Sequence, residues 1–304
     1  MDVLLLHNER AGDEAHSRKN LVALLKRHGH RVTYSTVDEG LADPKRIKNC
    51  ELIVAAGGDG TVRTVVTHDA ARTRPVAILP LGTANNIAHS LRLGTELPEI
   101  IAGWKNTSPR PLDLGVAKGP WGRTTFVEGI GFGLIGRTIS ILDALDAGCA
   151  HEFPSPADKL HRDKCVLAAL THEMPPIKAR VTLPDERIKD DFLLLELLNI
   201  SRAGPGLVLA RDADPSDGWL NLVSITVDER GKLIRKLECH TAGKRGARLH
   251  EVKTRKLSLE LEACELRIDD SIVLTAADFR RFPRAIARIE VKLEAGAVQL
   301  LAPS

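Results

Sequence analysis

The sequence predicts an α/β N-terminal domain, built as a doubly wound sheet, followed by a C-terminal β-sandwich domain. In the first third of the chain, short apolar runs typical of buried parallel strands alternate with helical patterns and glycine turns. From Leu112 onward, longer strand-like runs separated by turns follow one another, a pattern typical of a sandwich or a distorted barrel. The length of 304 residues is enough for two domains.

The N-terminal pattern is regular enough to place its elements. Gly29 is expected to end the first helix. We expect strands over residues 3–6, 31–36, 52–56 and 76–79, and helices over residues 17–28, 62–66, 87–91 and 97–104. In the second half, residues 134–170 interrupt the strand pattern with helical spacing. The remaining strand-like runs cover residues 112–116, 124–127, 179–183, 192–200, 219–227, 256–261, 266–268, 287–293 and 298–301.

The turn Gly57–Thr61 (Gly-Gly-Asp-Gly-Thr) joins a predicted buried strand to a predicted helix. Such a turn presents unpaired backbone N–H groups and the positive end of a helix dipole, which suits a phosphate. Asp59 within it would repel a phosphate unless a cation or a transferable proton lay between them, as in phosphoryl transfer with magnesium. The alternative is an ordinary turn in which Asp59 caps the helix.

A second turn of this kind, Pro80–Asn86 (Pro-Leu-Gly-Thr-Ala-Asn-Asn), follows the strand predicted over residues 76–79. Open α/β sheets bind ligands at the carboxyl ends of their strands, so we expect the two turns to lie side by side at one edge. Together they resemble the catalytic domain of the diacylglycerol kinase family, which includes YegS-like, bacterial diacylglycerol and sphingosine kinases. NAD kinases share the first turn, whereas the second favours the lipid kinases.

The resemblance implies a domain arrangement and a nucleotide site. It implies a nucleotide-binding domain over residues 1–110, a lipid-substrate domain over residues 111–285, and a last strand, 286–304, that returns to the first domain. The turn Asn8–Gly12 matches the family except that Glu9 replaces a proline. The residues implied to contact ATP are Asn8, Thr36, Gly57, Gly58, Asp59, Gly60, Thr61, Gly82, Thr83 and Asn85.

Two magnesium positions are implied as well. Asp113 aligns with an acid of an aspartate–water–magnesium network that includes Asp59, but Asn86 replaces the aspartate usual at the third position and removes a charge. A second, structural ion would be held by the Asp217 carboxylate and the main-chain carbonyls of Asp214 and Trp219, oxygen ligands that a hard cation accepts. The alternative there is a tight turn without an ion.

The main departure from the family lies at Asp269–Asp270–Ser271, where relatives have Asp-Gly-Glu with the glutamate as general base. Ser271 occupies the base position and cannot accept a proton unaided at neutral pH. Three hypotheses remain: Asp269 or Asp270 is the base, with Asp270 our catalytic candidate beside Asp59 and Asp113; Asp59 alone polarises the acceptor hydroxyl; or lipid phosphorylation is weak or lost. A metaphosphate-like transition state needs little base assistance.

Residues 131–136 match the dinucleotide fingerprint Gly-x-Gly-x-x-Gly between a strand and a helix. The match falls after the α/β alternation has ended, and no βαβ unit surrounds it. We therefore interpret these glycines as a packing turn rather than a Rossmann site.

Composition limits the partners. The aromatic fraction of 3% and the net charge of +3 argue against nucleic acid. Five scattered cysteines predict reduced thiols in a cytoplasmic protein, and no stretch approaches the ~20 apolar residues of a membrane span. The basic stretch 230–256 indicates either attraction to anionic headgroups or solvated strand edges. Expected partners are a lipid substrate, the inner face of the membrane as a peripheral contact and, as an open alternative, a second copy in a homodimer.

The resemblance implies an ATP- and Mg²⁺-dependent lipid kinase that transfers the γ-phosphate to the hydroxyl of a diacylglycerol- or sphingoid-like acceptor, which would enter between the domains. Two alternatives remain open. One is an NAD-kinase-like phosphotransferase acting on a soluble acceptor. The other is a catalytically weak nucleotide-binding homologue with a regulatory role, suggested by Ser271 in place of a glutamate.

Overall fold

The structure, a computed structural model, describes residues 1–11, 16–148, 153 and 155–302; Gly12 and Cys149 lie outside them. Two compact units make up the chain. The N-terminal unit comprises Met1–Leu114, Asp214–Gly218 and Glu294–Ser304, and the C-terminal unit comprises Gly115–Ala213 and Trp219–Leu293. The domain limits at residues 110 and 285 stay a prediction.

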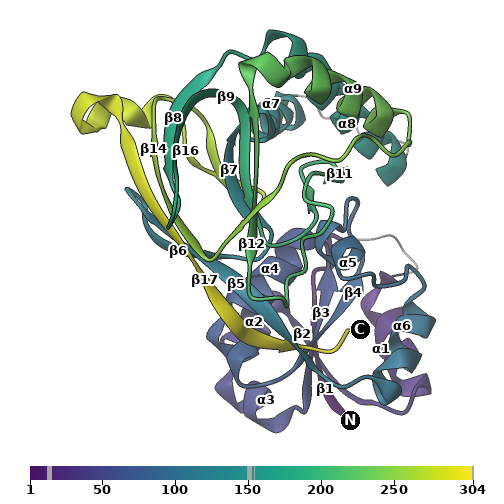
Figure 1. The fold of residues 1–304 in the computed structure, drawn as a ribbon. Helices are drawn as coiled ribbons and strands as arrows, with labels where there is room; N and C mark the ends of the chain where they lie inside the picture. The colour runs from purple at the N-terminus through teal and green to yellow at the C-terminus, as the bar shows by residue number, and fades with distance from the viewer. Residues whose placement is uncertain (12–15, 149–152, 154, 303–304) are drawn as a thin grey trace. The chain divides into compact units, whose positions relative to one another are not determined.

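The N-terminal unit is built on a parallel sheet in the order β4–β3–β1–β2 (Figure 1). Its strands are β1 (Asp2–His7), β2 (Arg31–Thr36), β3 (Leu52–Gly57) and β4 (Val76–Pro80). All six residues of β3 are buried, as expected for a central parallel strand covered on both faces. The predicted strands in this part of the chain are confirmed.

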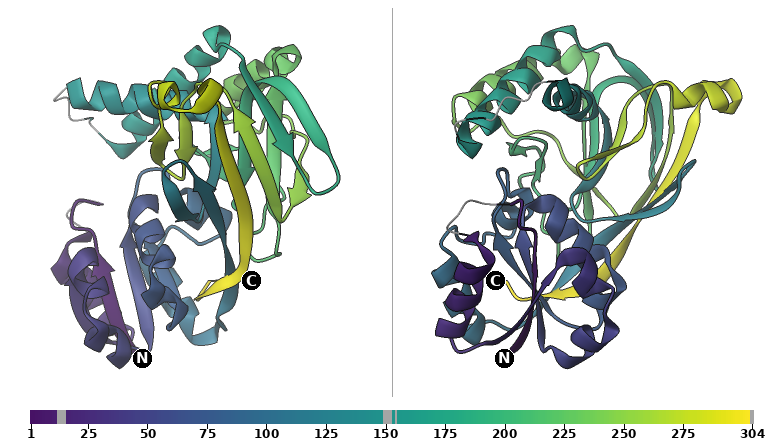
Figure 2. Two further views of the ribbon diagram at one scale, coloured as in Figure 1. Left: turned by 90° about the vertical axis from the view of Figure 1, so that its left-hand side faces the viewer. Right: turned by 180° about the vertical axis from the view of Figure 1, so that it is seen from behind.

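Helices cover both faces of this sheet (Figure 2). On one face, Val3 and Leu5 pack with Leu21 and Leu25 of α1 and with Ile101 of α6 in one buried cluster. The helices of this unit are α1 (Arg18–Arg27), α2 (Val37–Leu41), α3 (Pro44–Asn49), α4 (Asp59–Thr67), α5 (Asn86–Ser90) and α6 (Leu97–Gly103). The short α2 and α3 were not predicted, because five or six residues are too few to show a helical period.

The C-terminal unit is mostly β and has an antiparallel sheet in the order β16–β15–β7–β9–β8–β14–β17, with β12 paired to β9 and β13. Its strands are β5 (Arg110–Gly119), which begins in the N-terminal unit, β6 (Gly122–Phe126), β7 (Gly129–Gly133), β8 (Ile177–Thr182), β9 (Arg187–Leu198), β10 (Arg202–Ala203), β11 (Leu207–Val208), β12 (Leu220–Thr226), β13 (Val252–Thr254), β14 (Lys256–Leu261), β15 (Leu266–Ile268), β16 (Ser271–Leu274) and β17 (Ala287–Leu300). The predicted fold class, an α/β domain followed by a β domain, is confirmed.

The last strand belongs to both units. Residues 287–292 of β17 pair with β14 in the C-terminal unit, and Leu300 pairs in parallel with Val76 in the N-terminal unit. The sequence predicted two strands here, whereas the structure has one continuous strand. Gly296, with φ 61°, lies inside this strand, and its N–H donates to Asp113. The strand thus continues through residues 294–297, where the sequence pattern had suggested a break.

Three longer helices complete the C-terminal unit: α7 (Leu134–Gly148), α8 (Pro156–Glu173) and α9 (Arg230–Thr241). The predicted helical segment 134–170 gives α7 and α8. We did not predict α9 and interpreted its residues as part of a basic stretch. The available signal was Leu233 and Leu237, one turn apart and both buried in the core of the unit. The guanidinium of Arg230 donates to the carbonyls of Thr171 and Met174 at the end of α8.

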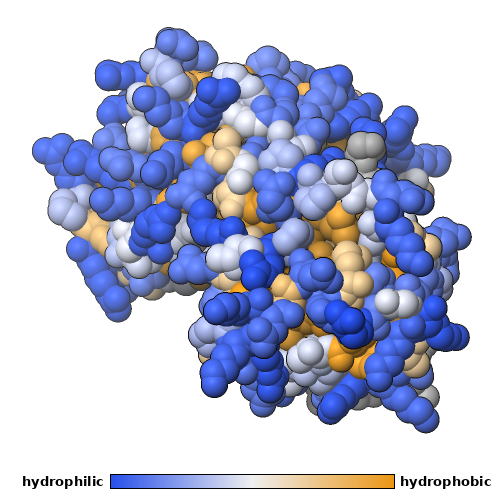
Figure 3. Space-filling view, turned by 90° about the horizontal axis from the view of Figure 1, so that it is seen from below, coloured by the Kyte–Doolittle hydropathy of each residue, from blue (hydrophilic) through white to orange (hydrophobic). Residues whose placement is uncertain are grey.

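No described helix is long and apolar enough to cross a bilayer. Hydrophilic side chains dominate the face shown in Figure 3, with apolar residues visible in smaller areas between them.

Candidate nucleotide and phosphoryl-transfer site

Main-chain pairing brings the two glycine turns together. In the parallel register Gly57 lies opposite Pro80, and the N–H of Leu81 donates to the carbonyl of Gly57 at 2.9 Å. Strands β3 and β4 therefore end side by side, and their turns leave the same edge of the sheet. This is the arrangement that the sequence predicted for the two turns.

The closest approach is between Gly58 and Gly82. A Cβ added to Gly82 would lie 2.5 Å from the Gly58 Cα, and one added to Gly58 would lie 3.2 Å from the Gly82 Cα. Neither turn can carry a side chain here unless the backbones separate. The result is a bed of main chain, with Gly58 as the N-cap of the nine-residue helix α4. Such a surface fits an anion, because backbone N–H groups can approach it directly.

The carboxylate of Asp59 links the two turns. Its Oδ2 accepts the N–H of Asn86 at 2.8 Å, and its Oδ1 accepts the N–H of Ile87 at 3.0 Å. Asp59 is the first residue of α4, and through these two bonds its carboxylate caps the start of α5. The Asp59 side chain is half-buried.

Two asparagines hold the surrounding loops. The Asn85 side chain closes its own turn, since its Oδ1 accepts from the Gly82 N–H at 2.9 Å and its Nδ2 donates to the Gly82 carbonyl at 2.7 Å. Asn85 is left-handed, with φ 46°, a conformation that asparagine tolerates. After β1, Asn8 Nδ2 donates to Thr61 Oγ1 at 3.2 Å. The structure thus groups Asn8 with the first turn, while Thr36 ends the neighbouring strand, paired with His7.

Asp113 is buried and positions chain segments. Its Oδ2 accepts the Gly218 N–H and its Oδ1 accepts the Gly296 N–H, both at 2.7 Å, while its own N–H donates to the Pro215 carbonyl at 2.6 Å. These contacts hold the segment 214–218 and the end of β17 to β5. Its implied membership of a magnesium network with Asp59 stays a prediction.

The segment Asp214–Gly218 forms the tight turn that the sequence offered as an alternative to an ion site. Asp214 Oδ1 accepts from the N–H and the hydroxyl of Ser216, and the Asp214 carbonyl accepts the Asp217 N–H at 3.2 Å. Among the described residues, no group of three His, Cys, Asp or Glu side chains could hold a metal. An ion at Asp217 would therefore depend on main-chain carbonyls, and this site stays a prediction.

The Asp269–Asp270–Ser271 segment is the tight turn between β15 and β16. Asp269 is 2% exposed and left-handed, with φ 51°. Its carboxylate accepts three main-chain N–H bonds, from Val127 at 3.2 Å, Glu128 at 2.8 Å and Gly129 at 3.1 Å. Burial raises the pKa of Asp269 to about 6, against the lowering effect of these bonds.

Asp270 differs from its neighbour because it is exposed, and the hydroxyl of Ser271 donates to its Oδ1 at 3.0 Å. The carboxylate of Asp269 is enclosed by backbone, whereas that of Asp270 reaches solvent. The role of Asp270 as the general base stays a prediction.

The glycine motif at residues 131–136 has no Rossmann context. Gly131 and Gly133 lie on β7, a strand between β9 and β15 in an antiparallel sheet. Sequence reasoning missed the two charged residues beside it, Glu196 and Arg267, which are fully buried. Their signal was present, since each is a charged residue between apolar neighbours in a predicted buried strand.

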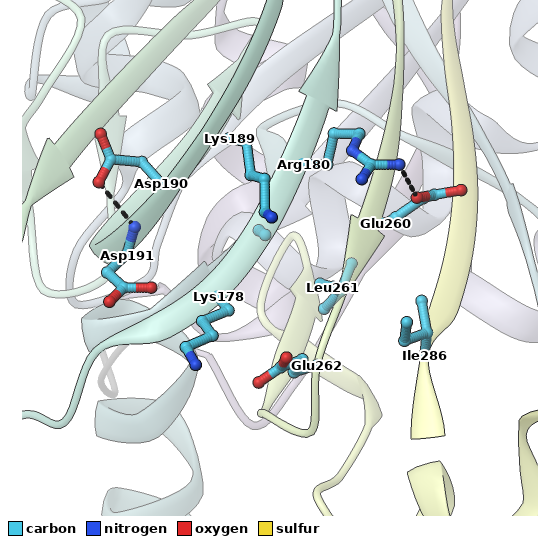
Figure 4. Close-up of a pocket in the computed structure, with 10 residues that line it drawn as sticks. Lys178, Arg180, Lys189, Asp190, Asp191, Glu260, Leu261, Glu262 and Ile286 are labelled. Carbon is cyan, nitrogen blue, oxygen red and sulfur yellow. Dashed lines mark hydrogen bonds and ion pairs between the residues drawn. The ribbon is translucent and has the colours of Figure 1, made fainter. Parts of the chain in front are cut away.

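A separate surface pocket of about 460 Å³ lies on the outward side of β8, β9 and β14 (Figure 4). Arg180 Nη1 donates to Glu260 Oε2 at 2.9 Å, and Lys178 and Lys189 extend from neighbouring strands. None of the predicted site residues lines it. Its mixed charges are typical of cross-strand pairing on a solvated sheet face.

Comparisons with known proteins give the family of this chain. Residues 2–117 match the model of the diacylglycerol kinase catalytic domain. A Pseudomonas aeruginosa protein named "Probable lipid kinase YegS-like" is 30% identical over 274 residues, which cover 86% of this chain and 84% of that protein. A Mycobacterium tuberculosis diacylglycerol kinase is 29% identical over 62% of this chain and 59% of its own length.

The fold comparison agrees. A crystal structure of a Bacillus anthracis diacylglycerol kinase superposes with a TM-score of 0.66 at 16% identity, covering 99% of this chain and 97% of that one. The chain belongs to the diacylglycerol kinase catalytic domain family, and it is a kinase by family membership.

Proposed function

We propose that this protein is an ATP- and Mg²⁺-dependent lipid kinase that phosphorylates the hydroxyl of a diacylglycerol- or sphingoid-like acceptor. The names of its relatives support the lipid acceptor. The observation that carries the phosphate site is the contact between Gly58 and Gly82, where a Cβ on either residue would meet the opposite backbone. Side chains are thereby kept away from the place where a triphosphate would rest.

In this proposal the ATP phosphates lie against the Gly57–Thr61 and Gly82–Asn85 turns. Backbone N–H groups at the start of α4 would stabilise their charge. Asp59 fits a magnesium ligand, because its half-buried carboxylate belongs to the first residue of α4, within the first glycine turn. A bound magnesium ion would neutralise charge that develops on the phosphates. The roles of Asn8, Thr36, Thr83 and Asp113 at the nucleotide remain part of the proposal.

Transfer breaks the bond between the γ-phosphorus and the oxygen that leaves with ADP, and forms a bond from that phosphorus to the lipid oxygen. The hydroxyl proton must leave, and Asp270 is the carboxylate we assign to accept it. Its exposure and its hydrogen bond from Ser271 support this assignment. Loose transition states need little base assistance, so one exposed carboxylate is sufficient.

The acceptor places the enzyme at a lipid surface, and we propose peripheral contact with the inner face of the membrane. The structure reduces the basic stretch available for this contact, because Arg230 binds helix carbonyls and the buried Lys236 donates to the Ala247 carbonyl. Lys244 and Arg245, just after α9, are exposed. Each would contribute about 1 kcal/mol toward an anionic surface.

The test is transfer of labelled phosphate from ATP to a lipid extract, with the product identified by mass. Asp59→Asn should lower the transfer rate about a hundredfold or more, because the carboxylate that would hold magnesium beside the phosphates is lost. Asp69→Asn is the matched control in the same unit, since the Asp69 side chain is 96% exposed. Equal rates for Asp59→Asn and wild type would end the assignment, and activity on NAD without lipid or detergent would favour the NAD-kinase-like alternative.

One observation favours a second candidate, a nucleotide-binding homologue with little activity. Ser271 occupies the position of the family's base, and its hydroxyl is committed to Asp270. ATP binding by calorimetry without turnover on any lipid would support this candidate. Replacing Asp270→Gly together with Ser271→Glu should then raise activity, and no change would place the base elsewhere.

A further inference from the structure

A buried ion pair spans three neighbouring strands of the C-terminal unit. Arg267 on β15, Gly131 on β7 and Glu196 on β9 lie directly opposite one another. The guanidinium reaches across the middle strand, with Nε 3.2 Å from Glu196 Oε1 and Nη2 2.6 Å from Oε2. Both charged side chains are fully buried.

Gly131 is the residue that makes this crossing possible. A Cβ at Gly131 would lie 2.1 Å from Glu196 Oε2 and 2.5 Å from the Leu195 carbonyl oxygen. Any side chain at position 131 would therefore displace the pair. This packing gives a physical reason for a glycine that the sequence presented as part of a nucleotide fingerprint.

Stability alone does not explain such a pair. The cost of removing two charges from water offsets most of their attraction, and well-packed apolar residues of similar volume often serve as well or better. Burial lowers the pKa of Arg267, but the adjacent Glu196 carboxylate outweighs it and raises that pKa; burial raises the pKa of Glu196 against the effect of Arg267. The third guanidinium nitrogen of Arg267 makes a further contact outside the ion pair.

That nitrogen, Nη1 of Arg267, donates to the main-chain carbonyl of Asp269 at 2.5 Å. Asp269 in turn donates its N–H to the Gly129 carbonyl at 2.8 Å and accepts three N–H bonds on its carboxylate from the segment 127–129. The bonds from Glu196 through Arg267 and the bonds from the segment 127–129 thus meet at Asp269, the first residue of the Asp269–Ser271 turn. The left-handed conformation of Asp269, unfavourable for a side chain with a Cβ, is held by these contacts.

We infer that Arg267 and Glu196 are positioning residues, a pair that crosses over Gly131 to fix the Asp269–Ser271 turn and with it the direction of the Asp270 carboxylate. The pair touches neither nucleotide nor lipid and acts through the carbonyl of Asp269. The inference deepens the proposed function and rests on it only for the role of Asp270. Both residues lie outside the two glycine turns.

The experiment uses the double variant Glu196→Leu with Arg267→Met, which removes both charges and retains most of the volume. Its melting temperature should equal or exceed that of wild type. The kcat for phosphate transfer to lipid should fall about tenfold to a hundredfold, because a small displacement of a reacting group is costly. The KM for ATP should stay within about twofold, because no residue of the glycine turns is altered.

A second readout does not depend on catalysis. Amide hydrogen exchange in peptides covering residues 126–130 and 267–272 should be faster in the double variant, and unchanged in β14 and β17. The matched control is Arg180→Met with Glu260→Leu, a pair on opposed positions of β8 and β14 whose side chains are 50% and 33% exposed. It should alter neither kcat nor exchange in those peptides.

The outcomes separate the inference from the proposed function. Unchanged exchange at both peptides, or an unchanged kcat in a wild type that phosphorylates lipid, overturns the positioning role. If wild type phosphorylates no lipid, the proposed function fails and the exchange result alone decides the inference. If the double variant does not fold, Arg267→Lys gives the same two readouts, because one ammonium group cannot reproduce two bonds to Glu196 and a third to the Asp269 carbonyl.

Discussion

Asp59 and Asp269 use the same device in different surroundings. Each carboxylate accepts main-chain N–H bonds from a neighbouring segment, Asp59 from Asn86 and Ile87, and Asp269 from the segment 127–129. Asp59 is half-buried beside a bed of glycine main chain, whereas Asp269 is 2% exposed and enclosed by the sheet. A carboxylate that holds backbone in place can also meet a ligand only where it is accessible, and Asp59 is the more exposed of the two.

The buried surroundings of Asp269 depend most on Arg267. Arg267→Met leaves Glu196 buried without its partner, so the free energy of unfolding should fall by about 3–5 kcal/mol. Arg180→Met, on an exposed pair of the same sheet, should cost less than about 1 kcal/mol. Urea unfolding followed by circular dichroism measures both. Similar losses for the two variants would contradict the view that the Glu196–Arg267 pair is shielded from water.

The pH dependence of stability separates Asp269 from ordinary carboxylates. Its pKa in the folded protein is raised to about 6 from the usual 3.8, with burial as the main cause and Arg267 and the backbone bonds opposing it. The stability that it contributes is therefore fully present below about pH 4 and is lost as the pH rises through 6.

Between pH 4 and pH 7, the unfolding free energy of wild type should fall by on the order of 2 kcal/mol relative to Asp269→Asn, which has no titrating group at this position. Guanidinium unfolding of both proteins at several pH values gives the difference directly. If the unfolding free energy of wild type instead rose with pH relative to that of Asp269→Asn, the pKa of Asp269 would be lowered in the folded protein, as at a surface ion pair.

Asp113 is a third carboxylate of this kind and lies on the enclosed side of the comparison. Asp113→Asn keeps one oxygen for either Gly218 or Gly296 and leaves the other N–H facing an amide. Unfolding free energy should fall by about 1–2 kcal/mol, measured by thermal unfolding. The control is Asp69→Asn, whose exposed side chain should change stability by less than about 0.5 kcal/mol. A neutral effect of Asp113→Asn would mean that its two bonds are dispensable.

The glycine bed at Asp59 is tested most directly at Gly82. Gly82→Ala places a methyl group 2.5 Å from the Gly58 Cα, so the turns must separate and ATP should bind about tenfold more weakly. Calorimetry with a non-hydrolysable ATP analogue measures the affinity. Gly103→Ala, where an added Cβ meets nothing within 4 Å, is the control. Unchanged affinity in Gly82→Ala would remove the second turn from the nucleotide site.

Local sequence was enough for the parts of the molecule that depend on neighbouring residues. Apolar runs of strand length predicted β1 to β4, and the glycine turns after β3 and β4 predicted the edge where they meet, because parallel strands place their carboxyl ends together. Helix α9 was missed because its basic residues concealed a short apolar face, and α2 and α3 are too short to show a period.

What the sequence by itself determined was the alternation of strand, glycine turn and helix, and the resemblance that the two turns carry. Tertiary structure alone decided that Gly131 leaves room for a buried ion pair, that Asp269 is enclosed while Asp270 is exposed, and that the Asp59 carboxylate caps the start of α5. These features depend on which residues of strands far apart in the chain are brought opposite one another. A sequence shows which residues can pair, but only the folded sheet shows which ones lie opposite each other.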